Sequence, residues 1–73
     1  MNNALAHYIL ETSEAYLGDI MVELNSLGAW IDGLEEHNGA IAVTFRAPEA
    51  NMREFELWLG RATDGIAKVQ RNV

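Results

Sequence analysis

The chain has 73 residues and no cysteine, so it has the length of one domain and neither a disulfide framework nor a zinc–thiolate site can stabilise it. Five basic and eleven acidic residues give a net charge of −6, which disfavours direct binding to nucleic acid. No apolar run approaches the roughly 20 residues of a membrane span, and the first ten residues lack the features of a signal peptide. We therefore expect a cytoplasmic protein that does not associate with a membrane.

The first third of the chain predicts a strand followed by an amphipathic helix. In residues 4–11 the side chains of one parity, which are Ala6, Tyr8 and Leu10, are suited to a buried sheet face. Apolar side chains then recur with a helical period; they are Leu17, Ile20, Met21, Leu24 and Leu27. Thr12 or Ser13 is suited to cap the start of this helix, and Gly28 is suited to end it.

The middle of the chain predicts a hairpin of two strands, residues 29–36 and 40–47. The Asn38-Gly39 pair between them is a strong hairpin signal. Gly33 interrupts the first of these strands and predicts a bulge or bend. In the second strand, one face carries Ile41, Val43, Phe45 and Ala47.

The last third predicts a second helix and a final strand. Pro48 is suited to the first turn of a helix that runs to about residue 61. The apolar stripe of this helix comprises Met52, Phe55, Leu59 and Ala62. A turn at residues 63–65 precedes a strand at 66–70. The order βαββαβ predicts one domain over residues 1–73 with an α+β, ferredoxin-like fold, in which both helices cover one face of a four-stranded antiparallel sheet.

Three segments resemble the C-terminal domain of elongation factor G and related translational GTPases. They are YLGDI at residues 16–20, LNS at 24–26 and IDGLE at 31–35. Matches continue without a gap through Pro48 and Met52 to Thr63 and Gly65, so the resemblance covers about 60 of the 73 residues. The segment TFRAPEANMREFELWL also resembles the C-terminal domain of Impact-type proteins. Both resemblances imply the same βαββαβ fold.

In the translation factors this domain contacts the ribosome near the stalk base, beside RNA. The resemblance therefore implies a ribosome-associated translation accessory, or one domain of a split translation factor. The chain has no P-loop, so GTPase activity is not implied. The family carries basic residues where this chain has His37 or an uncharged residue; the uncharged positions are Leu27, Gly28, Thr44, Gly60 and Ile66. Conversely, Trp30 and Trp58 replace residues that are usually polar in the family. These departures favour contact with protein over contact with RNA.

Candidate catalytic and metal-binding groups are sparse. His7 has no serine or cysteine nucleophile placed to work with it. The Glu-Glu-His run at residues 35–37 lies where strand side chains alternate, so its members should not converge on a metal. Gly18-Asp19 near the helix start predicts close packing at the glycine and a favourable carboxylate, in preference to an anion site. We therefore predict that the protein is not an enzyme and holds no cofactor and no metal.

Trp30 and Trp58 provide the one signal for binding that the sequence offers. Alternation with Ile31 places Trp30 on the sheet face away from the helices, together with Ile9, Ala40 and Ala42. The expected rim of this patch comprises His7, Asp32, Thr44 and Lys68. Two alternatives remain open, in which Trp30 folds over its own sheet or the bulge at Gly33 turns it inward. By helical spacing from Phe55, Trp58 is expected to border the core.

The leading hypothesis is a stand-alone, non-catalytic module for protein interaction or oligomerisation. Its partner is either another protein or a second copy of the chain, and the ribosome-associated role is the alternative. The candidate partner-binding residues are His7, Ile9, Trp30, Asp32, Ala42, Thr44 and Trp58.

Overall fold

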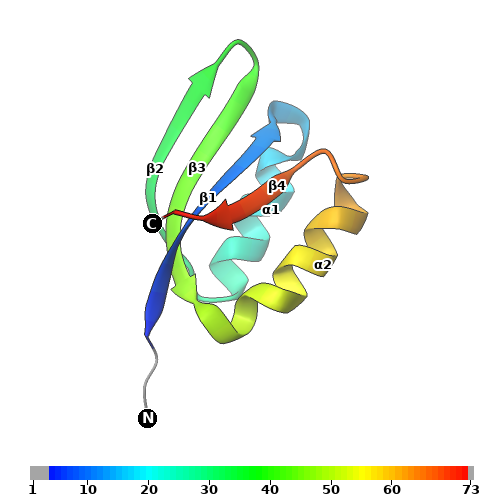
Figure 1. Cartoon of the computed structure of the whole chain (residues 1–73). Coiled ribbons are helices and arrows are strands. Elements are labelled where there is room, and N and C mark those ends of the chain that lie inside the picture. Colours follow the sequence, from blue (N-terminus) through cyan, green and yellow to red (C-terminus); the bar gives the residue numbers. More distant parts are fainter. Residues whose placement is uncertain (1–3, 73) are drawn as a thin grey trace.

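Four strands form one antiparallel sheet, and two helices cover one of its faces. The computed structural model, which describes residues 4–72, thus confirms the predicted α+β, ferredoxin-like fold (Figure 1). The elements are β1 (Leu5–Ser13), α1 (Glu14–Ser26), β2 (Trp30–His37), β3 (Ala40–Pro48), the short 3-10 helix η1 (Glu49–Asn51), α2 (Met52–Ala62) and β4 (Lys68–Arg71). The strand order is β2-β3-β1-β4, so β1 and β3 are central and β2 is an edge strand. None of these helices is long and apolar enough to cross a membrane.

The core lies between the helices and the inner face of the sheet. The strand residues predicted for this face are buried; they are Ala6, Tyr8 and Leu10 of β1 and Ile41, Val43, Phe45 and Ala47 of β3. Ile20 and Leu24 of α1 are fully buried, and the rest of that stripe packs against the core. Phe45 is central, because its ring centroid lies 5.5 Å from that of Tyr8 and 6.4 Å from that of Phe55 in α2.

The predicted turn and bulge in the hairpin are both confirmed. Asn38 and Gly39 have φ angles of 52° and 84°, as a two-residue hairpin turn requires. The pairing of β2 with β3 shifts between Ile31 and Gly33, so Asp32 is the extra residue of a bulge. A Cβ atom on Gly33 would lie only 2.9 Å from Oγ1 of Thr44. Glycine is therefore needed at this position for close packing.

Several predicted element ends were wrong, because the backbone pairs differently there. β1 continues through Thr12 and Ser13, which pair with β3, and Ser13 makes no side-chain capping bond to α1. Pro48 ends β3, as its sequence position also predicts, but it is extended, with φ −60° and ψ 125°, and precedes the first helical turn instead of lying within it. β4 begins at Lys68 and not at residue 66, since the amides of Ile66 and Ala67 bond back to Thr63.

Two packing predictions were also wrong. Ala62 was assigned to the buried stripe of the second helix but is exposed, and the next residue, Thr63, is buried in its place. Gly18 was expected to pack closely, yet a Cβ atom built there would meet nothing within 4 Å. Gly18 is exposed on α1, so neighbouring side chains do not require a glycine there.

Candidate functional site

The outer face of the sheet, which the helices leave uncovered, carries most of the candidate residues. Strand pairing arranges their side chains in rows across the sheet. One row joins Trp30, Arg46 and His7, and the next joins Gly33, Thr44, Ile9 and Gln70. A third row joins Glu35, Ala42, Glu11 and Lys68. The structure therefore places His7, Ile9, Ala42 and Thr44 on the same face as Trp30, as expected.

Trp30 is the most prominent side chain of this face, with 65% of its surface exposed. The guanidinium carbon of Arg46 lies 5.7 Å from the centroid of its ring. Arg46 is itself held by the carboxylate of Asp32, to which Nη2 and Nε donate hydrogen bonds of 2.9 and 3.1 Å. Asp32 shares the parity of Trp30 along β2, so its carboxylate lies on the same outer face. An exposed tryptophan is thus held in position by its own strand and the neighbouring one.

The apolar part of the outer face is less continuous than predicted. Trp30 lies on β2 and Ile9 on β1, and the polar side chains of Arg46 and Thr44 on β3 lie between them. The exposure of Trp30 excludes the alternative in which the bulge turns it inward. Its contact with Arg46 shows that it does lie against its own sheet. The outer face is therefore a mixed surface with one aromatic side chain and not a broad apolar patch.

Trp58 lies on a different surface from the other candidate residues. It projects from α2, is half-buried against the core as predicted, and stacks on Phe55 with ring centroids 5.8 Å apart and planes 28° from parallel. It lines a pocket of about 520 Å³ between the two helices. The residues that line this pocket are Glu23, Ser26, Leu27, Ala50, Asn51, Glu54, Phe55 and Trp58.

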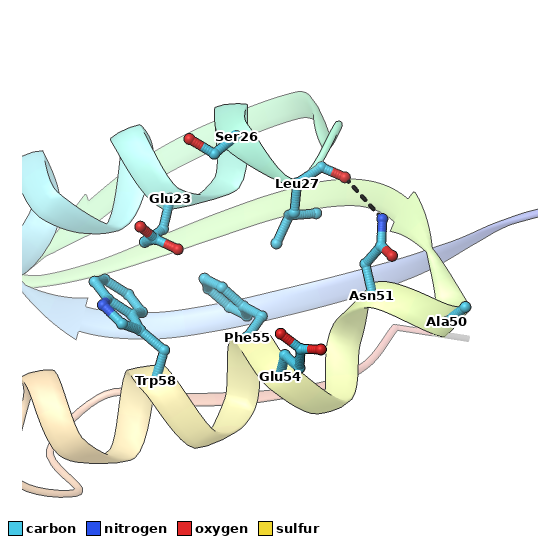
Figure 2. Close-up of a pocket in the computed structure, with 8 residues that line it drawn as sticks. All are labelled: Glu23, Ser26, Leu27, Ala50, Asn51, Glu54, Phe55 and Trp58. Carbon is cyan, nitrogen blue, oxygen red and sulfur yellow. Dashed lines mark hydrogen bonds between the residues drawn. The ribbon is translucent and has the colours of Figure 1, made fainter.

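Figure 2 shows how the two helices contribute to this pocket. Glu23 and Leu27 point from α1 toward α2, and Phe55 and Trp58 point from α2 toward α1. At one end, Nδ2 of Asn51 donates a 3.0 Å hydrogen bond to the carbonyl oxygen of Leu27, and this bond ties the end of α1 to the start of α2. The pocket therefore has an aromatic wall and carboxylates from both helices.

A second aromatic–arginine contact lies at the β4 edge of the sheet. The guanidinium carbon of Arg71 lies 5.6 Å from the ring centroid of Tyr8, and its Nη1 lies 2.6 Å from Oε2 of Glu49. Burial raises the pKa of the Tyr8 hydroxyl above its ordinary value, and the nearby Arg71 charge partly opposes this change. Across residues 4–72, no group of three or more histidine, aspartate and glutamate side chains is placed to hold a metal ion.

Two parts of these sites were not identified from the sequence. One is the contact of Arg46 with Asp32 and Trp30: alternation places all three residues on the outer face, but it does not show that their side chains meet. The sequence signal for this contact is an aspartate beside a glycine on one strand, Asp32-Gly33, and an arginine, Arg46, on the strand that pairs with it. The pocket depends on how the two helices are spaced over the sheet, and helical periodicity carries no information about that spacing.

Comparison with known proteins supports the architecture. A protein from Thermus thermophilus, known from its crystal structure, matches this chain with a TM-score of 0.82 at 19% sequence identity. The match covers 93% of this chain but 10% of the Thermus chain, so the present chain spans only a small part of that protein's length. Neither a protein-family model nor a curated protein sequence matches. The likeness shows the fold alone: this chain shares its ferredoxin-like architecture with one part of a much longer protein.

Proposed function

We propose that the protein is a non-catalytic interaction module of the cytoplasm that binds a protein partner, or a second copy of itself, through the outer face of its sheet. The observation that carries this proposal is the 65% exposure of Trp30, whose ring lies against the guanidinium of Arg46. Tryptophan and arginine are the residue types that contribute most to protein interfaces when they are buried there. Because Arg46 and Asp32 already hold the ring, little side-chain entropy is lost when a partner covers it.

The self-association form of this proposal is tested by sedimentation equilibrium over a wide range of concentrations. We expect the wild-type chain to form dimers or larger species as its concentration rises. Trp30→Ala should weaken this association at least about tenfold, because it removes the aromatic anchor. Leu57→Ala is the matched control, since Leu57 is also a large exposed apolar side chain but lies on α2, away from the sheet face.

A strict monomer at all concentrations would contradict self-association. The partner-binding form is then tested by recovering partners with the wild-type and Trp30→Ala chains. Equal recovery by both chains would remove the support for a role of Trp30, whereas selective loss with Trp30→Ala and not with Leu57→Ala would support it.

A second candidate function is a ribosome-associated translation accessory or a domain of a split translation factor, docked near the stalk base. It is favoured by the resemblance of residues 16–20, 24–26 and 31–35 to the last domain of elongation factor G, and by the presence of the same fold as one part of a longer protein. With a net charge of −6, docking would depend on ribosomal proteins more than on RNA phosphates.

This second function is tested by co-sedimentation with ribosomes. Binding that survives moderate salt would favour it, because contacts between exposed charges weaken as ionic strength rises. Loss of all binding at moderate salt would contradict it. A neighbouring gene for a translational GTPase that lacks its own C-terminal domain would independently support the split-factor form.

A further inference from the structure

We propose that the pocket between α1 and α2 binds an arginine side chain of a partner protein. The pocket lies in the helix layer, so this site is distinct from the outer sheet face and does not depend on the function proposed above. Two features of the pocket support the inference: its carboxylates, which form no ion pair within residues 4–72, and its aromatic wall. A third support is that two arginines of the chain each contact an aromatic ring and a carboxylate elsewhere in the fold.

The charges around the pocket favour a cation. The ion pairs of residues 4–72 occupy Asp32 and Glu49, so neither Glu23 nor Glu54 is neutralised by a basic side chain within that range. The pocket lies between the C-terminal end of α1, where the helix dipole is negative, and the N-terminal end of α2, where it is positive, so the two helix dipoles largely offset each other. The attraction for a positively charged group therefore comes from the carboxylates of Glu23 on α1 and Glu54 on α2.

The aromatic wall favours a guanidinium over an ammonium group. Trp58 is half-buried and stacks on Phe55, which is only 3% exposed, so the indole of Trp58 is the aromatic surface that the pocket presents beside the two carboxylates. A planar guanidinium can stack on such a surface while its N–H groups donate to a carboxylate, whereas a compact ammonium cannot do both equally well. The pocket volume of about 520 Å³ accommodates the guanidinium and its aliphatic stem.

The chain uses this combination of groups twice within its own fold. Arg46 lies over Trp30 and pairs with Asp32 on the outer sheet face. Arg71 lies over Tyr8 and pairs with Glu49 at the other edge of the sheet. The interhelical pocket contains a third aromatic and carboxylate set, but none of the arginines within residues 4–72 lines it. A partner protein would supply the arginine that completes this set.

The pocket is also preformed. The hydrogen bond from Asn51 to the carbonyl oxygen of Leu27 joins the two helices at one end, and Phe55 is anchored in the core. An entering side chain therefore needs no rearrangement of the helices, which reduces the entropic cost of binding.

The test is a titration followed by two-dimensional NMR of the full chain labelled with ¹⁵N. The probe is N-acetyl-arginine amide, and N-acetyl-citrulline amide is its uncharged counterpart of nearly the same shape. We expect the arginine probe to shift the indole N–H signal of Trp58 and the amide signals of Glu23 and Glu54. The citrulline probe should bind at least about fivefold more weakly, since it has lost the charge that the carboxylates recognise.

Variants then separate the pocket from the general negative charge of the protein. Both Glu23→Gln and Glu54→Gln should weaken binding of the arginine probe, and neither should impair folding, because neither carboxylate is buried. Glu36→Gln is the matched control: it removes the same charge from an exposed residue of β2 that does not line the pocket. It should leave the affinity within about twofold of wild type.

Three results of the titrations with the arginine and citrulline probes would overturn the inference. They are shifts spread over the surface and not centred on the pocket, equal binding of the citrulline probe, and equal weakening by Glu36→Gln and by the pocket variants. Tighter binding of spermidine than of the arginine probe would also overturn it, because the occupant would then be a free polyamine and not an arginine side chain.

Discussion

At the scale of single residues, Thr63 shows how one side chain can end a helix and start a turn. Its hydroxyl donates a 2.8 Å hydrogen bond to the carbonyl oxygen of Leu59 and accepts a 3.1 Å bond from the amide of Ala67. The residue is only 1% exposed, so water cannot replace these bonds. The hydroxyl thus fixes the path of the chain from α2 to β4.

Substitution of Thr63 tests this role. Thr63→Val keeps the shape of the side chain but leaves the amide of Ala67 without its acceptor, so we expect it to lower the free energy of unfolding by about 1–3 kcal/mol. Thr63→Ser retains the hydroxyl and is the matched control for the two bonds. Urea unfolding measures the stability, and amide hydrogen exchange should accelerate at Ala67 in the valine variant but not in the serine variant. Unchanged exchange at Ala67 in the valine variant would contradict the assignment.

Tyr8 predicts how stability depends on pH in the alkaline range. Burial raises the pKa of its hydroxyl above the ordinary value of 10.0. The unfolded chain loses the Tyr8 proton near the ordinary pKa of 10.0, whereas the folded chain keeps it until the pH reaches the higher folded pKa. Between these two pKa values, a rise in pH therefore lowers the free energy of unfolding. The contribution to stability is therefore complete below pH 10 and is lost as the pH rises through the folded pKa.

We expect Tyr8→Phe to reduce this alkaline loss of stability, because phenylalanine has no proton to lose. Urea midpoints measured at neutral pH and above pH 10 give the comparison. Tyr16→Phe is the control, since it leaves Tyr8 in place and should keep the wild-type loss. A Tyr8→Phe chain that loses as much stability above pH 10 as the wild type would exclude the raised pKa of Tyr8 as the cause.

At the scale of elements, the bulge in β2 shapes the outer sheet face. The pairing passes from Ile31 opposite Phe45 to Gly33 opposite Thr44, so Asp32 is the extra residue, and its carboxylate bonds to Arg46 on the face where Trp30 projects. A strand without the bulge would alternate regularly, and every residue beyond Asp32 would change face. The inner and outer faces of the hairpin therefore depend on this one extra residue.

Gly33→Ala tests the packing at the bulge. The new methyl group would lie 2.9 Å from Oγ1 of Thr44, so we expect a loss of about 1–3 kcal/mol in the free energy of unfolding. Thr44→Ala removes the clashing oxygen, so the double variant should lose less stability than the sum of the two single variants. A urea double-mutant cycle measures this coupling. Strictly additive losses would show that the contact with Thr44 is not the constraint on Gly33.

The same elements show which features the sequence could predict. The buried faces of β1 and β3 followed from alternation, because their antiparallel pairing has no irregularity and both inner faces meet the helices. Element ends did not follow, because Thr63 and Pro48 act through particular hydrogen bonds and dihedral angles and not through periodicity. The outer face was placed correctly from the same alternation. The pocket was not predicted, because it forms between elements that are separate in the sequence.

At the scale of the whole molecule, one aromatic cluster connects both layers. Phe45 lies on the central strand β3, stacks with Tyr8 on β1, and meets Phe55 edge-on from α2. Phe55 in turn stacks on Trp58 at the interhelical pocket. A continuous series of ring contacts therefore joins the sheet, α2 and the wall of the pocket. The candidate arginine site depends on the packing of the core for this reason.

Phe45→Ala should consequently remove a large share of the stability of the domain. Truncating a buried phenylalanine costs about 3–5 kcal/mol, and a chain of this length has a total stability of roughly 4–11 kcal/mol. Urea unfolding followed by circular dichroism measures the loss, and Leu57→Ala, at an exposed site of α2, should change stability by no more than about 0.5 kcal/mol. Because Phe55 would lose its edge contact, Trp58 fluorescence, recorded in a Trp30→Phe background, should change at the same urea concentration as the circular dichroism signal. Separate transitions for the two signals would mean that the helix layer holds the pocket wall without support from Phe45.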